Sequence, residues 1–394
     1  MSIVESYLPT GKPSAQDSLW NIAYSDNSGQ TNFKYVFDIH DASGNQLIRT
    51  KIFPDVNNGR GYFDAGGIVR NLMQYDWFTT DNLADVYEPD ASGEIAIDYQ
   101  VRIGEDYNID ASGITTLNMA SGTVRAFNWT PGAFDRGSFN LDNYSGKFLT
   151  TRSANTFTIH KDEPFYIPYY NSSTSTRTVT VVKTIANGST TTYTVSLAYT
   201  KSVGFKQMNL ARDPVALLLS YPDDNDLLGN AVKYTFRIGS GDTLTFIIDD
   251  CKGFYEPRYL FFMNRFGMFE TCKFGMVSKL QSNTTRKAFS KSGNSFETDR
   301  VRTIVGSKYN ETKINYAQEI NWVYRLTKDF PTDNEWQWME ELMYSPIIYL
   351  LEGGKYYPVT IRNTSYERFQ QQYAKLKTFE IEVELNQSRS AFLR

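Results

Sequence analysis

Apolar and polar residues alternate with a period of two along much of the chain, a pattern typical of β-strands that bury one face. The clearest case is residues 94–103, where every second residue from Ile95 to Ile103 is apolar or aromatic. Similar alternation, interrupted by a short Gly-containing turn, predicts antiparallel hairpins. These hairpins span residues 33–53, 176–199, 232–249 and 347–361, and a last strand is predicted at 377–385. The pattern therefore predicts antiparallel sheets as the main structure.

One strand departs from the alternation. Residues 259–263 are apolar throughout, which indicates a strand buried on both faces. A turn at 264–267 and a second strand at 268–276 follow. Because the turn carries a polar Asn-Arg pair, Asn264, Arg265 and Phe266 are expected at an exposed hairpin tip.

Two short helices are predicted. Asp64 is placed as the N-cap of a helix near 64–73, which carries apolar residues on one side. The second helix, near 333–344, has capping-box spacing between Thr332 and Glu335. Trp336 lies on its apolar stripe, whereas Trp338 lies off the stripe and is expected to be exposed.

The chain is long enough for several domains, since it has 394 residues. We expect a mainly β protein with two to three antiparallel β-sandwich or barrel-like domains, at 1–150, 151–255 and 256–394. Residues 104–150 and 278–300 are expected to be long loops that become ordered against neighbours. Within the second range, 281–295 is either a solvated loop or an arm that reaches an adjacent subunit.

Composition narrows the class of protein. Aromatic residues make up 15% of the chain, which favours strands and interfaces. The net charge of −4 provides no basic footprint, so no nucleic-acid partner is expected. No apolar run is long enough to span a membrane, and no signal peptide is visible. Assembly in a reducing cytoplasm is expected, with Cys251 and Cys272 either both reduced or joined in one bridge.

The residues that could carry chemistry do not form a recognised motif. The two histidines, His40 and His160, lack further ligands at metal spacing, and no nucleophile elbow, P-loop or dinucleotide fingerprint occurs. We therefore expect no catalytic residue, cofactor or metal. Three weaker readings remain open: a glycosidase pair among Asp249-Asp250 or Asp223-Asp224, Ca²⁺ binding at 223–226, and a sugar-stacking tryptophan platform. The platform candidates are Trp77, Trp129, Trp322, Trp336 and Trp338.

Three stretches together resemble structural proteins of tailed phages that infect Bacteroidetes. They are the "YVFDI…LIRTKIFP…GYFDAGGIVRN" segment within 33–73, the segment 259–274 with its Met-Asn-Arg-Phe-Gly core, and the segment 336–383 with "SPIIYLLEGGKYYPVTI". The resemblance implies a tail-tip or baseplate-region protein of the distal-tail type. It covers about half of the chain, and its motifs are structural rather than catalytic.

The sequence thus predicts a non-enzymatic virion protein, assembled in the bacterial host, that forms a homo-oligomeric ring. Six subunits is the expected number for such a ring, which would link the tail tube to host-contact proteins. The alternatives are a trimeric receptor- or glycan-binding spike, a head or connector protein, and a glycan hydrolase. The candidate interface residues are Trp338, Tyr344, Tyr356, Tyr357, Asn264, Arg265 and Phe266.

Overall fold

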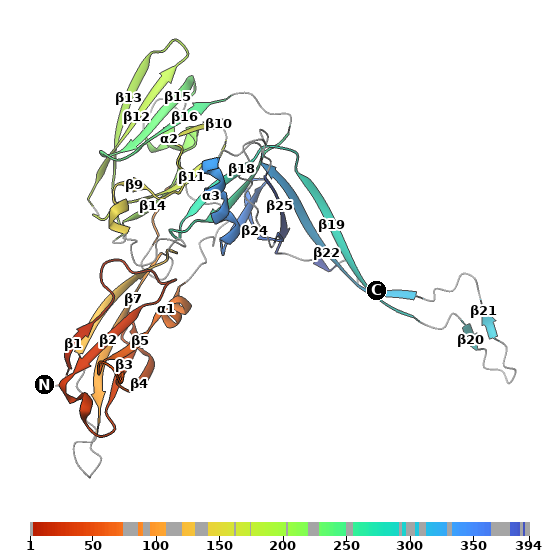
Figure 1. The fold of residues 1–394 in the computed structure, drawn as a ribbon. Coiled ribbons are helices and arrows are strands. Elements are labelled where there is room, and N and C mark those ends of the chain that lie inside the picture. Colours follow the sequence, from red (N-terminus) through yellow and green to blue (C-terminus); the bar gives the residue numbers. More distant parts are fainter. Residues whose placement is uncertain are drawn as a thin grey trace. The chain divides into compact units, whose positions relative to one another are not determined.

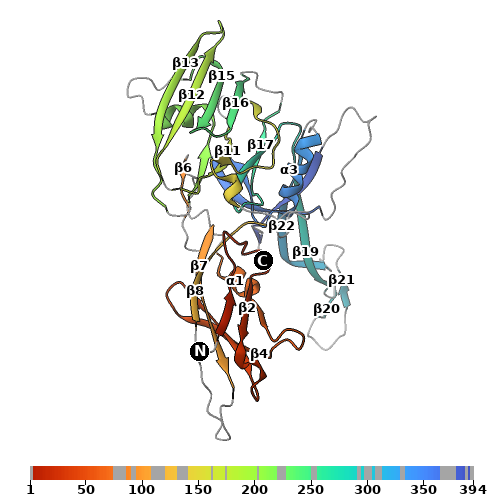
Figure 2. The same ribbon diagram turned by 60° about the vertical axis from the view of Figure 1, so that its left-hand side comes forward.

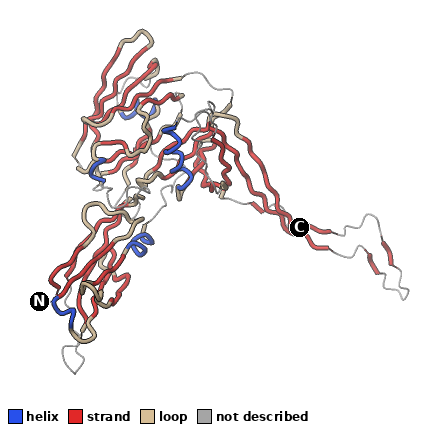
Figure 3. The backbone as a smooth tube through the Cα atoms, in the orientation of Figure 1, coloured by secondary structure: helices blue, strands red, loops and turns tan. Residues whose placement is uncertain are grey.

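The computed structural model is mainly β, and strands dominate the backbone trace (Figure 3). The residues it describes are 3–73, 86–89, 95–107, 120–130, 141–160, 163–173, 175–201, 204–219, 228–249, 255–290, 294–296, 304–306, 313–328, 333–363, 379–386 and 389–390. The expected fold class is confirmed.

The chain divides into two compact units. Unit 1 comprises 1–252, 261–271 and 337–346, and unit 2 comprises 253–260, 272–336 and 347–394. Residues 1–150 and 151–255, predicted as separate domains, fall almost entirely in unit 1. Each range supplies most of a hydrophobic core of its own there.

The first core of unit 1 lies in a β-sandwich. One sheet has the order β1-β2-β5, formed by Ile3–Tyr7, Trp20–Ser25 and Gly61–Asp64. The other has the order β4-β3-β7-β8, formed by Gln46–Ile52, Lys34–Asp41, Ala96–Asp106 and Ala120–Phe127. Apolar side chains of both sheets join one cluster with helix α1 (Gly66–Leu72), which makes this a packed sandwich. The N-cap of α1 is Ala65 rather than the predicted Asp64, although the Asp64 carboxylate accepts from the Gly66 N–H at 2.8 Å.

The second core of unit 1 lies in another sandwich, part of which Figure 2 shows as β12, β13, β15 and β16. Its larger sheet has the order β10-β16-β15-β12-β13, formed by Thr156–Ile159, Thr243–Ile248, Ala231–Ile238, Arg177–Ile185 and Thr190–Leu197. Its smaller sheet has the order β6-β14-β11-β9, formed by Val86–Tyr87, Phe205–Asn209, Tyr166–Tyr170 and Lys147–Phe148. The pair β10–β16 is parallel. Helix α2 (Arg212–Leu218) is not among the elements that the periodicity predicts.

Most of unit 2 belongs to an eight-stranded sheet of order β18-β17-β23-β24-β25-β22-β19, with β26 also paired to β22. Its strands are Phe269–Phe274, Arg258–Met263, Ile348–Glu352, Lys355–Ile361, Phe379–Leu385, Lys313–Lys328, Lys279–Ser290 and Arg389–Ser390. The chain of β17, β18 and helix α3 (Asp333–Tyr344) passes from one unit to the other.

Strands β19 and β22 continue as a long two-stranded ribbon (Figure 1). Strand β25 pairs only with Val323–Lys328 of β22, and β26 only with Glu319 and Ile320. Among the described residues, the part of β22 before residue 319 is therefore paired with β19 alone. Strands β20 (Asn294–Phe296) and β21 (Ile304–Gly306) form a separate hairpin.

The structure confirms all four predicted hairpins and the last strand. Two details are corrected. Strand β3 is buried on both faces rather than one, since Val36, Asp38 and His40 are buried beside the expected apolar residues. Residues 279–290, expected to be a loop, form β19, which pairs with β22 along its 12 residues. None of these residues is fully buried, so the strand lacks the apolar alternation by which the other strands are predicted.

Candidate functional site

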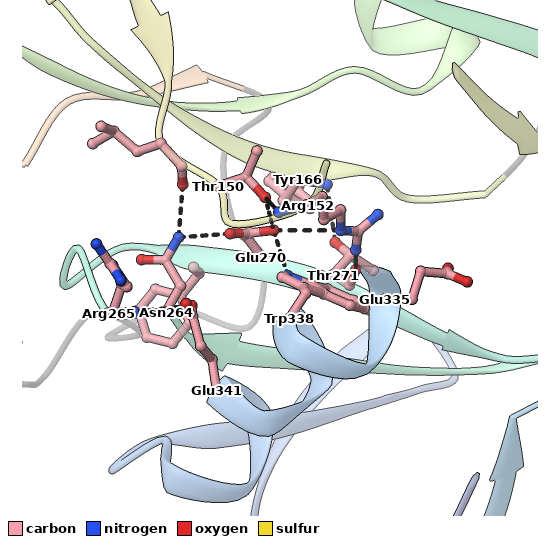
Figure 4. A network of polar contacts seen from close by, with 12 residues as sticks. Thr150, Arg152, Tyr166, Asn264, Arg265, Glu270, Thr271, Glu335, Trp338 and Glu341 are labelled. Carbon is pink, nitrogen blue, oxygen red and sulfur yellow. Dashed lines mark hydrogen bonds and ion pairs between the residues drawn. The ribbon is translucent and has the colours of Figure 1, made fainter. Parts of the chain in front are cut away.

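A buried polar network lies around Glu270 in unit 1 (Figure 4). Glu270 stands on β18, just after the turn at 264–267. Helix α3 contributes Trp338, and the segment that follows β9 contributes Thr150 and Arg152. Three parts of the chain that are far apart in sequence therefore meet at one carboxylate.

Both oxygens of Glu270 accept hydrogen bonds. Asn264 Nδ2 donates to Oε1 at 2.7 Å, while Thr150 Oγ1 and Trp338 Nε1 donate to Oε2 at 2.9 and 2.8 Å. Arg152 Nε lies 3.5 Å from Oε2 as an ion pair. Glu270 is 1% exposed, and a buried carboxylate is stable only when it is paired in this manner.

Opposing effects act on the pKa of Glu270. Burial, the largest effect, raises the pKa above its ordinary value, while Arg152 and the three donors act in the opposite direction. Arg152 is also held by contacts other than its ion pair with Glu270. Its guanidinium carbon lies 3.6 Å from the centre of the Trp338 ring, which is a cation–π contact, and it donates to the Thr271 carbonyl.

Asn264 closes the turn before Glu270. Its Nδ2 also donates to the Leu149 carbonyl at 2.8 Å, and its Oδ1 accepts from the N–H groups of Phe266 and Met268 at 3.0 and 3.3 Å. Asn264 is 4% exposed and Phe266 is 1% exposed. The prediction that they form an exposed tip is wrong, because the amide serves the turn and the ring packs inside.

Trp338 is also a correction. It is 1% exposed, because its ring packs against Phe262 and the Arg152 guanidinium and its Nε1 donates to Glu270. Of the other candidate interface residues, Tyr344 is 72% exposed, and Arg265, Tyr356 and Tyr357 are partly buried. The structure therefore does not gather the seven predicted residues on one surface.

Sequence reasoning missed Glu270, Arg152 and Thr150. A single Glu in an apolar strand was the available signal, since a carboxylate between Phe269 and Phe274 requires a buried partner. The partner's position 118 residues earlier cannot be found from periodicity.

The network is built to hold segments together. Every oxygen of Glu270 is occupied by donors of the protein, so the carboxylate is not presented to a ligand. Within the described residues, no group of three or more His, Cys, Asp or Glu side chains could hold a metal ion. None of the helices in that same part of the chain has the length and apolar character to cross a bilayer.

The structure tests only some of the weaker chemical interpretations. Trp129, Trp336 and Trp338 are buried, so they cannot form the sugar-stacking platform. The acidic loop 223–226 and Asp250 lie outside the described residues, as does Cys251. Cys272 is buried.

Glu341 on α3 gives the site a pH dependence. Burial and then repulsion by Glu270 raise its pKa to about 7, although the Arg265 N–H donates to its Oε2 at 3.3 Å. The folded chain therefore holds a proton here that the unfolded chain releases between about pH 4.5 and 7. We expect the free energy of unfolding to fall as pH rises through this window, by up to about 1.4 kcal/mol per pH unit.

Chemical denaturation of the native chain and of Glu341→Gln at pH 5 and pH 8 tests this expectation. The Gln variant should lose this part of the pH dependence. An unchanged slope in the variant would contradict the assignment to Glu341.

Comparisons with known proteins give no family. No family model matches the chain, and no curated protein matches it. The crystal structure of squid arrestin is similar over 64% of this chain and 100% of its own, with 11% sequence identity and a TM-score of 0.14. A likeness this weak carries no argument about fold or function.

Proposed function

We propose that the chain is a structural subunit of a tailed-phage particle, in the tail or baseplate region. Identical copies form a ring that links the tail tube to host-contact proteins, and the ribbon of β19 and β22 joins neighbours. The protein is not an enzyme in this proposal. The resemblance in three stretches supports the place in the virion, and the ribbon supports assembly.

The ribbon is the observation that carries the proposal. Strand β19 is an edge strand of 12 residues, and none of its residues is fully buried. A long exposed edge is a template for pairing with another chain, and monomeric proteins usually shorten or cover such edges. Exposed apolar side chains lie along the ribbon, namely Leu280, Phe289 and Tyr316 at 56, 48 and 50% exposure.

The stretches that carry the resemblance are packing elements. Residues 33–73 form the hairpin β3–β4, β5 and α1, while 259–274 form β17, β18 and the Asn264 turn. Residues 336–383 include most of α3, the hairpin β23–β24 and part of β25. Motifs of this kind specify a scaffold, which is what a virion subunit requires.

The mass of the purified protein in solution, together with a cryo-EM map of the intact particle, tests the proposal. A closed ring at the tail tip, with the ribbon against a neighbour, supports it. A peripheral trimer points to the spike, and a place on the head points to the connector. Either of these results overturns the proposed position.

Phe289 and Tyr316 give a direct test of the ribbon. Their ring centres lie 6.2 Å apart near its outer end, so charge at both positions removes apolar contact area and adds repulsion. We expect Phe289→Asp with Tyr316→Asp to abolish the oligomer without changing the thermal unfolding temperature by more than a few degrees. Light scattering measures the first and calorimetry the second.

Val56→Asp is the matched control, because Val56 is fully exposed in the first sandwich, away from the ribbon residues in sequence and sheet. It should leave the oligomer intact. An intact oligomer in the double ribbon variant would contradict the role given to β19 and β22.

A further inference from the structure

A polar pocket of about 360 Å³ opens in the second sandwich of unit 1. Its wall is made by the start of β9, the end of β11, the start of β12 and the β15–β16 turn. Its lining includes the side chains of Lys147, Tyr169, Asn171, Arg177 and Asp242. The volume is within the range of small-molecule sites.

The backbone segments that form the pocket wall pack closely against each other. A Cβ added to Gly241 would lie 2.1 Å from the Gly146 carbonyl oxygen, so two glycine segments approach closely here. The Gly146 N–H donates to the Tyr170 carbonyl at 2.9 Å, and the Gly241 N–H donates to the Ile238 carbonyl at 3.0 Å. The wall is therefore held by backbone hydrogen bonds and does not depend on a loose loop.

Arg177 is incompletely satisfied in this wall. Its Nη2 donates to Asn171 Oδ1 at 2.9 Å. Its Nε is shielded from water and has no hydrogen-bond acceptor, and no carboxylate of the described residues lies within 4.0 Å of the guanidinium. Arg177 as a whole is only partly buried and lines the pocket, so an anion that enters the pocket can supply the missing counter-charge.

A second cation lies in the same wall. Lys147 is exposed, and its contact is the Tyr144 ring, 5.9 Å from Nζ, rather than an acid. Asp242 supplies the pocket's carboxylate. Burial raises the pKa of Tyr169, and of the two charges that act on its hydroxyl, Arg177 lowers this pKa whereas Asp242 raises it. The pocket thus carries two positive groups, one negative group and several neutral donors and acceptors.

We propose that this pocket binds an acidic monosaccharide unit, whose anionic group, a carboxylate or a phosphate, meets Arg177 and Lys147. A guanidinium binds either group through paired N–H donors. Asp242 and the Tyr169 hydroxyl line the pocket and can bind sugar hydroxyls, which carry both donors and acceptors, while the buried Asn171 amide holds Arg177 in place. This inference does not rest on the proposed ring, because the pocket lies within a single chain.

Titration calorimetry on the full chain, with glucuronate, glucose 6-phosphate, glucose and inorganic phosphate, tests the proposal. Glucuronate or glucose 6-phosphate should bind at least about tenfold more tightly than glucose, and comparison of the two identifies the anionic group. Arg177→Gln should weaken that binding by about tenfold or more.

Arg237→Gln is the matched control. It removes one positive charge from neighbouring strand β15, where Arg237 is exposed and does not line the pocket. It should leave the affinity unchanged. Four results would overturn the proposal: no binding of either sugar acid, equal binding of glucose, equally tight binding of inorganic phosphate alone, or equal loss in both variants.

Discussion

Replacing Arg152 by Met should lower the free energy of unfolding by about 3–5 kcal/mol, because it leaves the buried Glu270 carboxylate without its counter-charge. Met keeps the aliphatic length of the side chain, so the packing loss is small beside the charge effect. The loss includes the cation–π contact with Trp338, at 3.6 Å from the ring centre. Urea denaturation followed by tryptophan fluorescence measures the change.

An ion pair of the same chemistry near the surface provides the control. Arg125 Nε lies 2.7 Å from Asp98 Oδ1, and their side chains are 36 and 29% exposed. Arg125→Met should therefore cost less than about 1 kcal/mol, because water solvates the remaining carboxylate. Equal losses of unfolding free energy in the two variants would show that Arg152 does not compensate a buried charge on Glu270.

A second substitution separates charge from packing. In the double variant Arg152→Met with Glu270→Gln, no bare charge remains, and the Gln carbonyl still accepts one of the donated hydrogen bonds. It should be more stable than Arg152→Met alone. If the double variant is less stable by the sum of both single losses, the two side chains are not coupled.

The strands could be predicted because a strand with one buried face alternates apolar and polar residues with a period of two. Tyr99 and Val101 are buried and Gln100 is half-buried, as the alternation indicates. The turns could be predicted because Gly188, with φ of +84°, occupies a conformation that favours glycine. Both signals are local, and the fold class needs nothing more.

The site could not be predicted, since its contacts join distant segments. Trp338 lies off the helical stripe, and only the position of Glu270 makes it a buried donor. Asn264 has the composition of an exposed turn, but its amide is directed inward to Leu149 and Glu270. Polar residues that satisfy a buried partner look the same in sequence as polar residues that face water.

Replacing Gly267 by Ala should destabilise unit 1 by more than about 3 kcal/mol, for two reasons that act together. Gly267 has φ of +76°, where an L side chain costs about 1 kcal/mol. Its added Cβ would also lie 1.8 Å from the Asn128 carbonyl oxygen. That carbonyl cannot withdraw easily, because the Asn128 N–H donates to Ile95 at 2.7 Å, so the turn at 264–267 must shift instead.

Gly188→Ala isolates the conformational part of that loss. Gly188 has the same sign of φ, but a Cβ there meets no atom within 4 Å, so only about 1 kcal/mol is expected. Parallel denaturation curves for the two variants measure the difference, which is the cost of the close approach. Because the turn positions Asn264 on Glu270, Gly267→Ala should also change the fluorescence of the folded state through Trp338, whereas Gly188→Ala should not. Equal losses would mean that the Asn128 carbonyl gives way, and that the 264–267 turn is not fixed by this contact.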